Sequence, residues 1–188
     1  MKKVAIVVGH LPTDRGAYNK THKMGEFDFN NEMAPMVARH LRLMGMLPVI
    51  IYRDTYTKLP GNVNAAMDYK GDSVCLSLHC NAANGKPNGT EVLYYHKSRN
   101  SERLASLLLE EITNCLGLKN RGLKPVNYEY QGSHNDRGGY LLKKTAMPAV
   151  IVEPFFIDSD SSLELALSKM DDLAKAYAEG CARYFNLK

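Results

Sequence analysis

The chain has 188 residues, of which 45% are hydrophobic and 23% are charged, and its formal net charge is +4. Such a length and composition are ordinary for one globular domain that builds its core without disulfide staples. The basic bias is compatible with an anionic polymer as partner, but it falls well short of the Lys/Arg stripe of a nucleic-acid-binding protein. We therefore expect one domain over residues 1–188, no separate binding domain and no nucleic-acid partner.

The cysteines and the N-terminal sequence indicate the compartment. None of the four cysteines forms a CxxC pair, and Cys75 and Cys115 fall on apolar faces, so buried reduced thiols are expected in place of a disulfide framework. The apolar run near the N-terminus is too short for a secretory signal, and no small-residue cleavage site follows it. No stretch approaches the ~20 apolar residues of a membrane span. The prediction is a protein made in the cytoplasm, without a signal peptide and without an integral membrane segment.

The first predicted element is a strand over residues 4–8, an unbroken apolar run rich in β-branched residues that suits a strand covered on both faces. A polar loop follows over residues 11–25, and its length suggests a functional role. From Glu26 the apolar residues take helical spacing until Gly45, which is a natural stop. Pro35 lies inside this helix and implies a late start or a bend near it.

The middle of the chain alternates strands and helices. Strands are predicted over residues 49–52, Ser73–Leu78 and Thr90–Tyr95, with a short helix over residues 62–70 between the first two. So few residues separate the second strand from the third that the third is expected to run antiparallel at one side of the sheet. An amphipathic helix over residues 101–116 follows.

The last part of the chain begins with a second long polar loop over residues 119–139. A short strand over residues 140–142 and a buried strand over residues 148–152 come next. A capping box at residues 161–164 opens one final helix that extends to Tyr184. Strands that alternate with helices predict an α/β protein, a single domain with a mostly parallel twisted sheet of about six strands and helices on both faces.

Three of the predicted strands end in a titratable side chain. His10, His79 and Glu153 each stand at the carboxyl end of a buried strand. Open α/β sheets place their ligand crevice at that edge, so these side chains predict one shared site. A carboxylate that follows the apolar residues 150–152 would be largely desolvated, which is costly unless it is paired or functional.

Glu26 adds a second carboxylate, at the start of the helix after the first strand. Two histidines and one carboxylate are the ligand set of a catalytic zinc with an open position for water, which gives the hypothesis that His10, Glu26 and His79 hold one zinc ion. Glu153 is left for proton transfer, and the set suffices for metal-assisted hydrolysis of an amide. A structural interpretation stays open, since strand-end histidines often serve as hydrogen-bonding residues and acidic residues are favoured at helix starts.

Several motifs, taken in order and spacing, resemble those of one enzyme family. They are the opening strand with Gly9-His10, residues 14–17, Glu26 with Asn30 at the family spacing, and residues 52–54, 77–82, 89–92 and 147–153. Together they resemble the zinc-dependent N-acetylmuramoyl-L-alanine amidases, a catalytic domain shared by bacterial autolysins, sporulation amidases and phage endolysins. The resemblance covers nearly the whole chain.

The resemblance implies zinc-dependent hydrolysis of the amide bond between N-acetylmuramic acid and L-alanine in peptidoglycan. In that family the residues that match His10, Glu26 and His79 hold Zn2+. The residue that matches Glu153 is catalytic, and it deprotonates the attacking water and then protonates the departing amine.

The departures from the family pattern concern local geometry. Leu11-Pro12 replaces a usual pair of glycines after the first histidine. Cys80 replaces a small residue and is expected to point away from the metal. Pro154 lacks the backbone N–H that family members often keep after the catalytic glutamate.

Weaker signals concern substrate binding. The loop over residues 119–139 holds His134 and Arg137, which would lie near the cleaved bond if the loop meets the substrate, whereas a solvated polar loop is the other interpretation. Asn81 is a candidate for substrate binding or for orienting a metal-bound histidine. His22 lies close to Glu26 in sequence and could compete as a ligand, although its loop position argues against this.

Two other functions are alternatives. One is a zinc peptidase or carboxypeptidase that acts on stem peptides, and the other is a non-catalytic peptidoglycan-binding module, against which the four site residues argue. For the amidase, the resemblance and the missing export signal favour a phage or prophage endolysin. It would act as a monomer on the cell wall after release by a holin, a membrane-permeabilising partner. A sporulation amidase of the mother cell is the alternative origin.

Overall fold

The computed structural model describes residues 1–67, 71–128 and 138–187, and within them it shows a six-stranded sheet in the order β4-β1-β5-β8-β6-β7. Four of these strands are mutually parallel, namely β1 (Lys3–Val8), β4 (Leu47–Tyr52), β5 (Ser73–Leu78) and β8 (Ala149–Glu153). The other two, β6 (Thr90–Tyr95) and β7 (Asn120–Val126), are parallel to each other and run opposite to the rest. The mostly parallel sheet and the antiparallel strand at one side are thus confirmed.

The central strand β1 shows why the predicted strands are apolar along their whole length. It hydrogen-bonds to β4 on one side and to β5 on the other. Val4, Ile6 and Val8 point into one hydrophobic cluster, whereas Ala5 and Val7 point into a second cluster on the opposite face. All five are fully buried, because a strand covered on both faces has no position left for a polar side chain.

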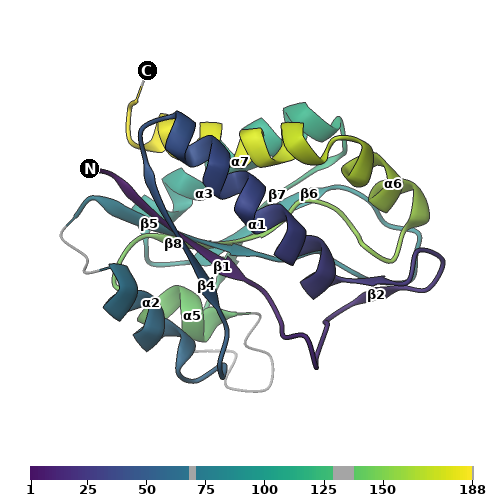
Figure 1. The fold of residues 1–188 in the computed structure, drawn as a ribbon, viewed down its shortest axis with the longest axis horizontal. Coiled ribbons are helices and arrows are strands. Elements are labelled where there is room, and N and C mark those ends of the chain that lie inside the picture. The colour runs from purple at the N-terminus through teal and green to yellow at the C-terminus, as the bar shows by residue number, and fades with distance from the viewer. Residues whose placement is uncertain (68–70, 129–137, 188) are drawn as a thin grey trace.

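Helices cover both faces of the sheet, as predicted (Figure 1). The first face carries α1 (Glu26–Leu43), α3 (Arg99–Leu116) and α7 (Met170–Tyr184), and α6 (Asp160–Ser168) leads into α7. The second face carries the shorter α2 (Leu59–Met67) and α5 (Gly139–Lys144). None of the helices in the described parts of the chain is both long enough and apolar enough to cross a membrane.

Helix α1 begins at Glu26 and continues through Pro35, so the late start that the proline implied does not occur. Asp28 closes its first turn, because one of its carboxylate oxygens accepts a hydrogen bond from the backbone N–H of Gly25 at 2.7 Å. The same oxygen accepts a hydrogen bond from Arg15 Nε at 2.7 Å. The long loop before the helix contains a small hairpin, β2 (Tyr18–Asn19) and β3 (Met24–Gly25).

Several predicted elements in the second half are wrong. The expected loop over residues 119–139 contains the edge strand β7, which is half-buried and so needs no apolar alternation. The expected strand over residues 140–142 lies instead in helix α5, since a short apolar run fits either structure. The single final helix is divided into α6 and α7 at Lys169, and the residue before α6 is Ser159, which makes no side-chain capping hydrogen bond.

Two smaller differences concern the middle of the chain. Helix α2 begins at Leu59, three residues before the predicted start, and the structure describes it to Met67, because residues 68–70 lie outside the described residues. The cysteines are free thiols, in agreement with the prediction, but Cys115 is partly exposed where a buried thiol was expected.

Candidate metal centre

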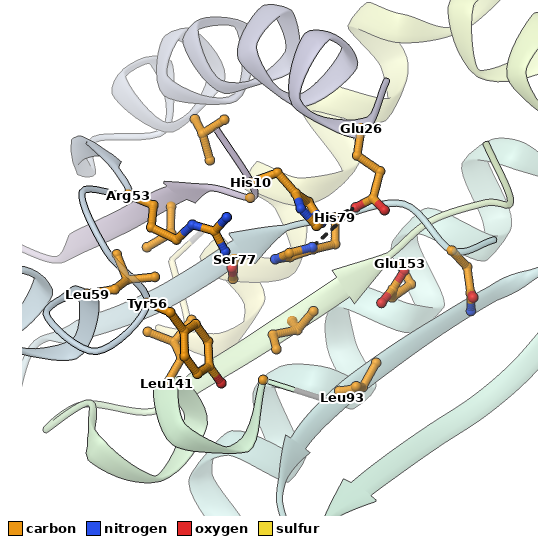
Figure 2. Close-up of a pocket in the computed structure, with 16 residues that line it drawn as sticks. His10, Glu26, Arg53, Tyr56, Leu59, Ser77, His79, Leu93, Leu141 and Glu153 are labelled. Carbon is orange, nitrogen blue, oxygen red and sulfur yellow. Dashed lines mark hydrogen bonds and ion pairs between the residues drawn. The ribbon is translucent and has the colours of Figure 1, made fainter. Parts of the chain in front are cut away.

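Strand and helix ends bring chemically active side chains to one edge of the sheet. His10 follows β1 by two residues, His79 directly follows β5, Glu153 is the last residue of β8, and Glu26 is the first residue of α1. Because β1, β5 and β8 are adjacent and parallel, their carboxyl ends meet, and Figure 2 shows the four side chains around a common space. All four line one cavity of about 330 Å³. The structure therefore brings the four residues together, while the role of each stays a prediction.

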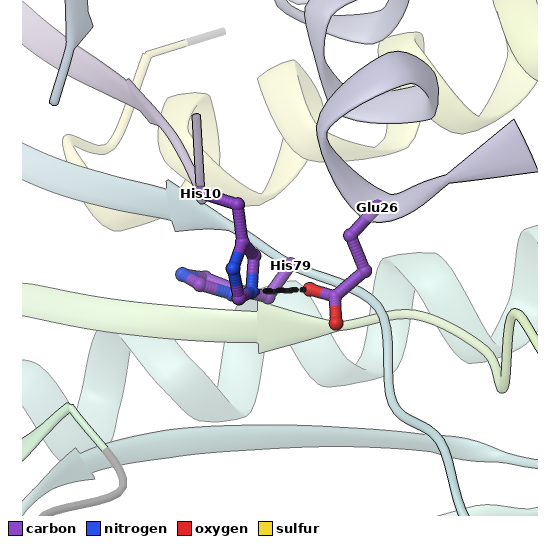
Figure 3. Close-up of side chains that lie close together, drawn as sticks. All are labelled: His10, Glu26 and His79. Carbon is purple, nitrogen blue, oxygen red and sulfur yellow. Dashed lines mark hydrogen bonds and ion pairs between the residues drawn. The ribbon is translucent and has the colours of Figure 1, made fainter. Parts of the chain in front are cut away.

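His10, Glu26 and His79 converge on one point (Figure 3). Glu26 Oε2 lies 3.1 Å from His10 Nε2 and 3.3 Å from His79 Nδ1. The two imidazoles meet edge to face with ring centroids 5.1 Å apart, and the ligand atoms that the three residues offer all lie within 4.8 Å of one another. The ligand atoms of a tetrahedral zinc ion stand about 3.4 Å apart, so both the donor set and its spacing fit such an ion.

The protein holds the Glu26 side chain in its ionised form. Burial by itself raises the pKa of this carboxyl group, but hydrogen bonds from His10 and His79 outweigh it and lower the pKa to about 2. Two backbone N–H groups also bind this carboxylate, since Ala17 donates to Oε1 at 3.1 Å and Cys80 donates to Oε2 at 3.2 Å. A metal ligand must be deprotonated, and Glu26 meets that condition throughout the neutral range.

The backbone conformation of His10 and two nearby glycines allow the imidazole rings of His10 and His79 to pack closely. His10 has φ of 64°, a left-handed conformation that is uncommon for a residue with a side chain and that often marks a functional site. A Cβ on Gly16 would lie 2.7 Å from the ring of His10, and one on Gly9 would lie 2.7 Å from the ring of His79. Both positions therefore require glycine for the close approach of an imidazole.

Glu153 lies in the same cavity, beside a second carboxylate whose charge is compensated. It pairs in register with Glu91 of the neighbouring strand β6. Glu91 is 2% exposed and accepts a hydrogen bond from Arg121 Nε at 2.9 Å, so its negative charge is balanced locally. The backbone after Glu153 is fixed although Pro154 has no N–H, because the Pro154 carbonyl accepts a hydrogen bond from the Thr90 hydroxyl at 2.7 Å.

The remaining predicted residues divide between the cavity and other places. Asn81 lines the cavity, and its side-chain oxygen accepts a hydrogen bond from the next backbone N–H at 2.9 Å. Cys80 is buried in the core beside Asn30 and so points away from the cavity, as expected. His22 contacts Glu164 at 3.2 Å and takes no part in the cluster of possible ligands. His134 and Arg137 lie outside the described residues.

Sequence reasoning from strand ends missed three side chains with polar groups that line the cavity. These are Arg53, Tyr56 and Ser77. The signal for Arg53 was present, since it directly follows β4, whose carboxyl end lies at the same edge as those of β1 and β5. Ser77 lies two residues before His79 on β5, and side chains at this spacing share one face of a strand.

Comparisons with known proteins show the family to which the chain belongs. A family model described as N-acetylmuramoyl-L-alanine amidase matches residues 4–183. The chain is 33% identical over 184 residues to the N-acetylmuramoyl-L-alanine amidase LytC of Bacillus subtilis, a match that covers 94% of the chain and 34% of that protein. It is 32% identical over 199 residues to the endolysin of Bacillus phage SPP1, which covers 100% of the chain and 67% of that protein.

A solved structure shows the same fold. The crystal structure of an N-acetylmuramoyl-L-alanine amidase from Clostridium difficile 630 superposes with a TM-score of 0.84 and 23% sequence identity. The match covers 100% of this chain and 98% of that one, so the two molecules share one fold over nearly their whole length.

Proposed function

Because the chain belongs to the N-acetylmuramoyl-L-alanine amidase family, we propose that it hydrolyses the amide bond between N-acetylmuramic acid and L-alanine in peptidoglycan. The observation that carries this proposal is the convergence of His10, Glu26 and His79 in a cavity that Glu153 also lines. Two imidazole ligands beside one carboxylate favour zinc over magnesium or calcium, which prefer oxygen ligands. We therefore propose Zn2+ as the cofactor.

The proposed mechanism divides the work between the ion and Glu153. A zinc ion, when bound, supplies Lewis acidity for the attacking water and for the scissile carbonyl. Glu153 takes the proton from that water as general base and returns it to the departing α-amine of L-alanine as general acid. Two backbone N–H groups hold the Glu26 carboxylate, and the imidazoles of His10 and His79 lie close against Gly16 and Gly9, so little reorganisation is needed on binding.

Product analysis of digested peptidoglycan tests this function. Purified cell walls are incubated with the zinc-loaded protein, and the free amino groups and soluble peptides are identified by mass spectrometry. We expect intact stem peptides with free N-terminal alanine. Release of single amino acids would instead identify a carboxypeptidase, and binding to the walls without any cleavage would identify a non-catalytic module.

An endolysin role is a finer proposal, supported by the likeness to the phage SPP1 endolysin. In this role the protein would reach the cell wall only after a holin has permeabilised the membrane. Expression of the chain in a susceptible bacterium should therefore cause lysis when a holin is co-expressed and little lysis without one. Equal lysis under both conditions would contradict the proposed route of release.

A further inference from the structure

Arg53 is placed at the carboxyl edge of the sheet with part of its guanidinium group unsatisfied. Its side chain is only 16% exposed, and it lines the same cavity as His79 and Glu153. Figure 2 shows it extending from the end of β4 into the cavity. Within the described residues, its buried Nε has no hydrogen-bond partner. A buried donor without a partner costs free energy, so this group calls for a ligand or another explanation.

The ion pair that Arg53 does make leaves this donor unused. Asp14 Oδ2 lies 3.6 Å from Arg53 Nη2, which is longer than a hydrogen bond, and the Asp14 side chain is 70% exposed. A charge pair at this distance, with one partner exposed to solvent, contributes little stability. Asp14 can therefore orient the guanidinium without occupying the face that the arginine turns to the cavity.

Ser77 presents a second unsatisfied group to the same cavity. The residue is 1% exposed, and its hydroxyl oxygen has no hydrogen-bond partner among the described residues. It lies on β5 two residues before His79, so its hydroxyl is fixed by a strand at the centre of the sheet. A guanidinium and a hydroxyl that line the same cavity form a suitable pair of donors for a carboxylate.

We propose that Arg53 and Ser77 bind a carboxylate on the peptide arm of the substrate, and so select muramoyl peptides in which that group is free. This inference rests on the proposed function. The sugar side of the cleaved bond is uncharged, because the lactyl carboxyl group is itself part of the amide. The first carboxylate beyond the bond is the α-carboxyl of the second residue, a glutamate that is joined to the next residue through its γ-carboxyl. The apolar walls formed by Leu59, Leu141 and Ile151 suit the methyl group of the intervening alanine.

A pair of matched substrates tests the proposal. Two muramoyl tripeptides are compared that differ only at the second residue, whose α-carboxyl group is free in one and amidated in the other. Arg53→Gln should lower kcat/KM for the free-carboxylate substrate by roughly tenfold or more, mostly through KM, and change the amidated substrate far less. Ser77→Ala should shift the same ratio by a smaller factor. Arg53→Lys should retain part of the preference, since it keeps the charge but loses the planar fork.

The ratio between the two substrates separates recognition from a merely structural role. If Arg53→Gln lowers cleavage of both substrates equally, the proposal is wrong, because damage to the fold affects both alike. Arg183→Gln is the control, since Arg183 lies on α7 and contacts Glu110 and Glu111 outside the cavity. Wild-type protein that cleaves neither substrate would contradict the proposed function instead. Calorimetric titration then measures how tightly the wild-type protein binds the two tripeptides without the sugar, one with the free α-carboxyl group and one with the amide. Equal affinity for both would show that the protein does not recognise the carboxylate.

Discussion

The two carboxylates of the site differ in what surrounds them. Glu26 lies in hydrogen-bonding distance of both imidazoles, and its pKa of about 2 keeps it ionised. Glu153 lines the same cavity but is not part of the His10, Glu26 and His79 cluster of possible ligand atoms. This difference supports the proposed roles, in which Glu26 holds a metal ion and Glu153 exchanges a proton, the division that metal-assisted amide hydrolysis needs.

Glu153→Gln separates these two roles. The substitution keeps the size of the side chain but removes its ability to accept a proton, so kcat should fall by about 100-fold or more while zinc content stays unchanged. His79→Ala should lose zinc and activity together. Glu110→Gln, on the exposed surface of α3, is the control and should change neither quantity. Near-normal turnover by Glu153→Gln, measured on a muramoyl peptide, would show that Glu153 is not the general base.

Gly16→Ala tests whether the tight contact with His10 matters for metal binding. Gly16 has φ of +73°, and an added Cβ would lie 2.7 Å from the His10 ring. Gly45→Ala is a matched control, since Gly45 has φ of +76° and nothing within 4 Å of an added Cβ. Both should lose about 1 kcal/mol of stability from backbone strain, but only Gly16→Ala should weaken zinc binding, measured by competition with a chromophoric chelator. Equal zinc affinities for the two variants would contradict this account.

At the residue scale, the position of a residue at the end of a strand is enough to predict part of the site. His10, His79 and Glu153 follow apolar runs that could be read directly from the sequence, and the structure places all three in one cavity. Arg53 follows a strand in the same way, yet the pairing of β4 beside β1 had to be known before its side chain could be assigned to that cavity. Ser77 lies within the motif at residues 77–82, but nothing in the sequence shows that its hydroxyl lacks a partner among the described residues.

At the scale of elements, prediction succeeded where the local pattern and the tertiary position agree. The fully buried strands β1, β5 and β8 carry unbroken apolar runs, so their sequences already indicate their place in the sheet. The sequence of strand β7 does not indicate a strand, because it contains glycine and proline. This strand is formed by pairing at the edge of the sheet. Helix α5 has six residues, too few for helical periodicity to be visible in its sequence.

Pro35→Ala tests the cost of the proline inside α1. Pro35 is exposed, so alanine should lose little packing, while the substitution restores a backbone N–H and a better helix former. We expect the free energy of unfolding in urea to rise by about 1 kcal/mol or more, with amidase activity unchanged. A fall in stability would indicate that the proline ring makes a contact that the helix requires.

At the scale of the whole molecule, burial predicts which thiols report on global unfolding. Cys75, Cys80 and Cys181 are buried in the core, and burial raises the pKa of the Cys75 thiol to about 12. Cys115 is partly exposed. In native protein an aromatic disulfide reagent should label Cys115 rapidly and the other three only at the rate of unfolding. Cys115→Ser should lack the rapid phase, and rapid labelling of that variant would mean that the core opens more readily than its packing implies.

At the level of the whole fold, the carboxyl ends of parallel strands and the start of α1 meet at one cavity. The central claim is that this cavity binds a zinc ion. The most direct measurement is the zinc content of the purified protein, together with hydrolysis of a muramoyl peptide before chelation, after chelation and after zinc is returned. We predict about one zinc ion per chain, loss of hydrolysis on chelation and recovery with Zn2+ but not with Mg2+. Full amide hydrolysis by metal-free protein would contradict the account.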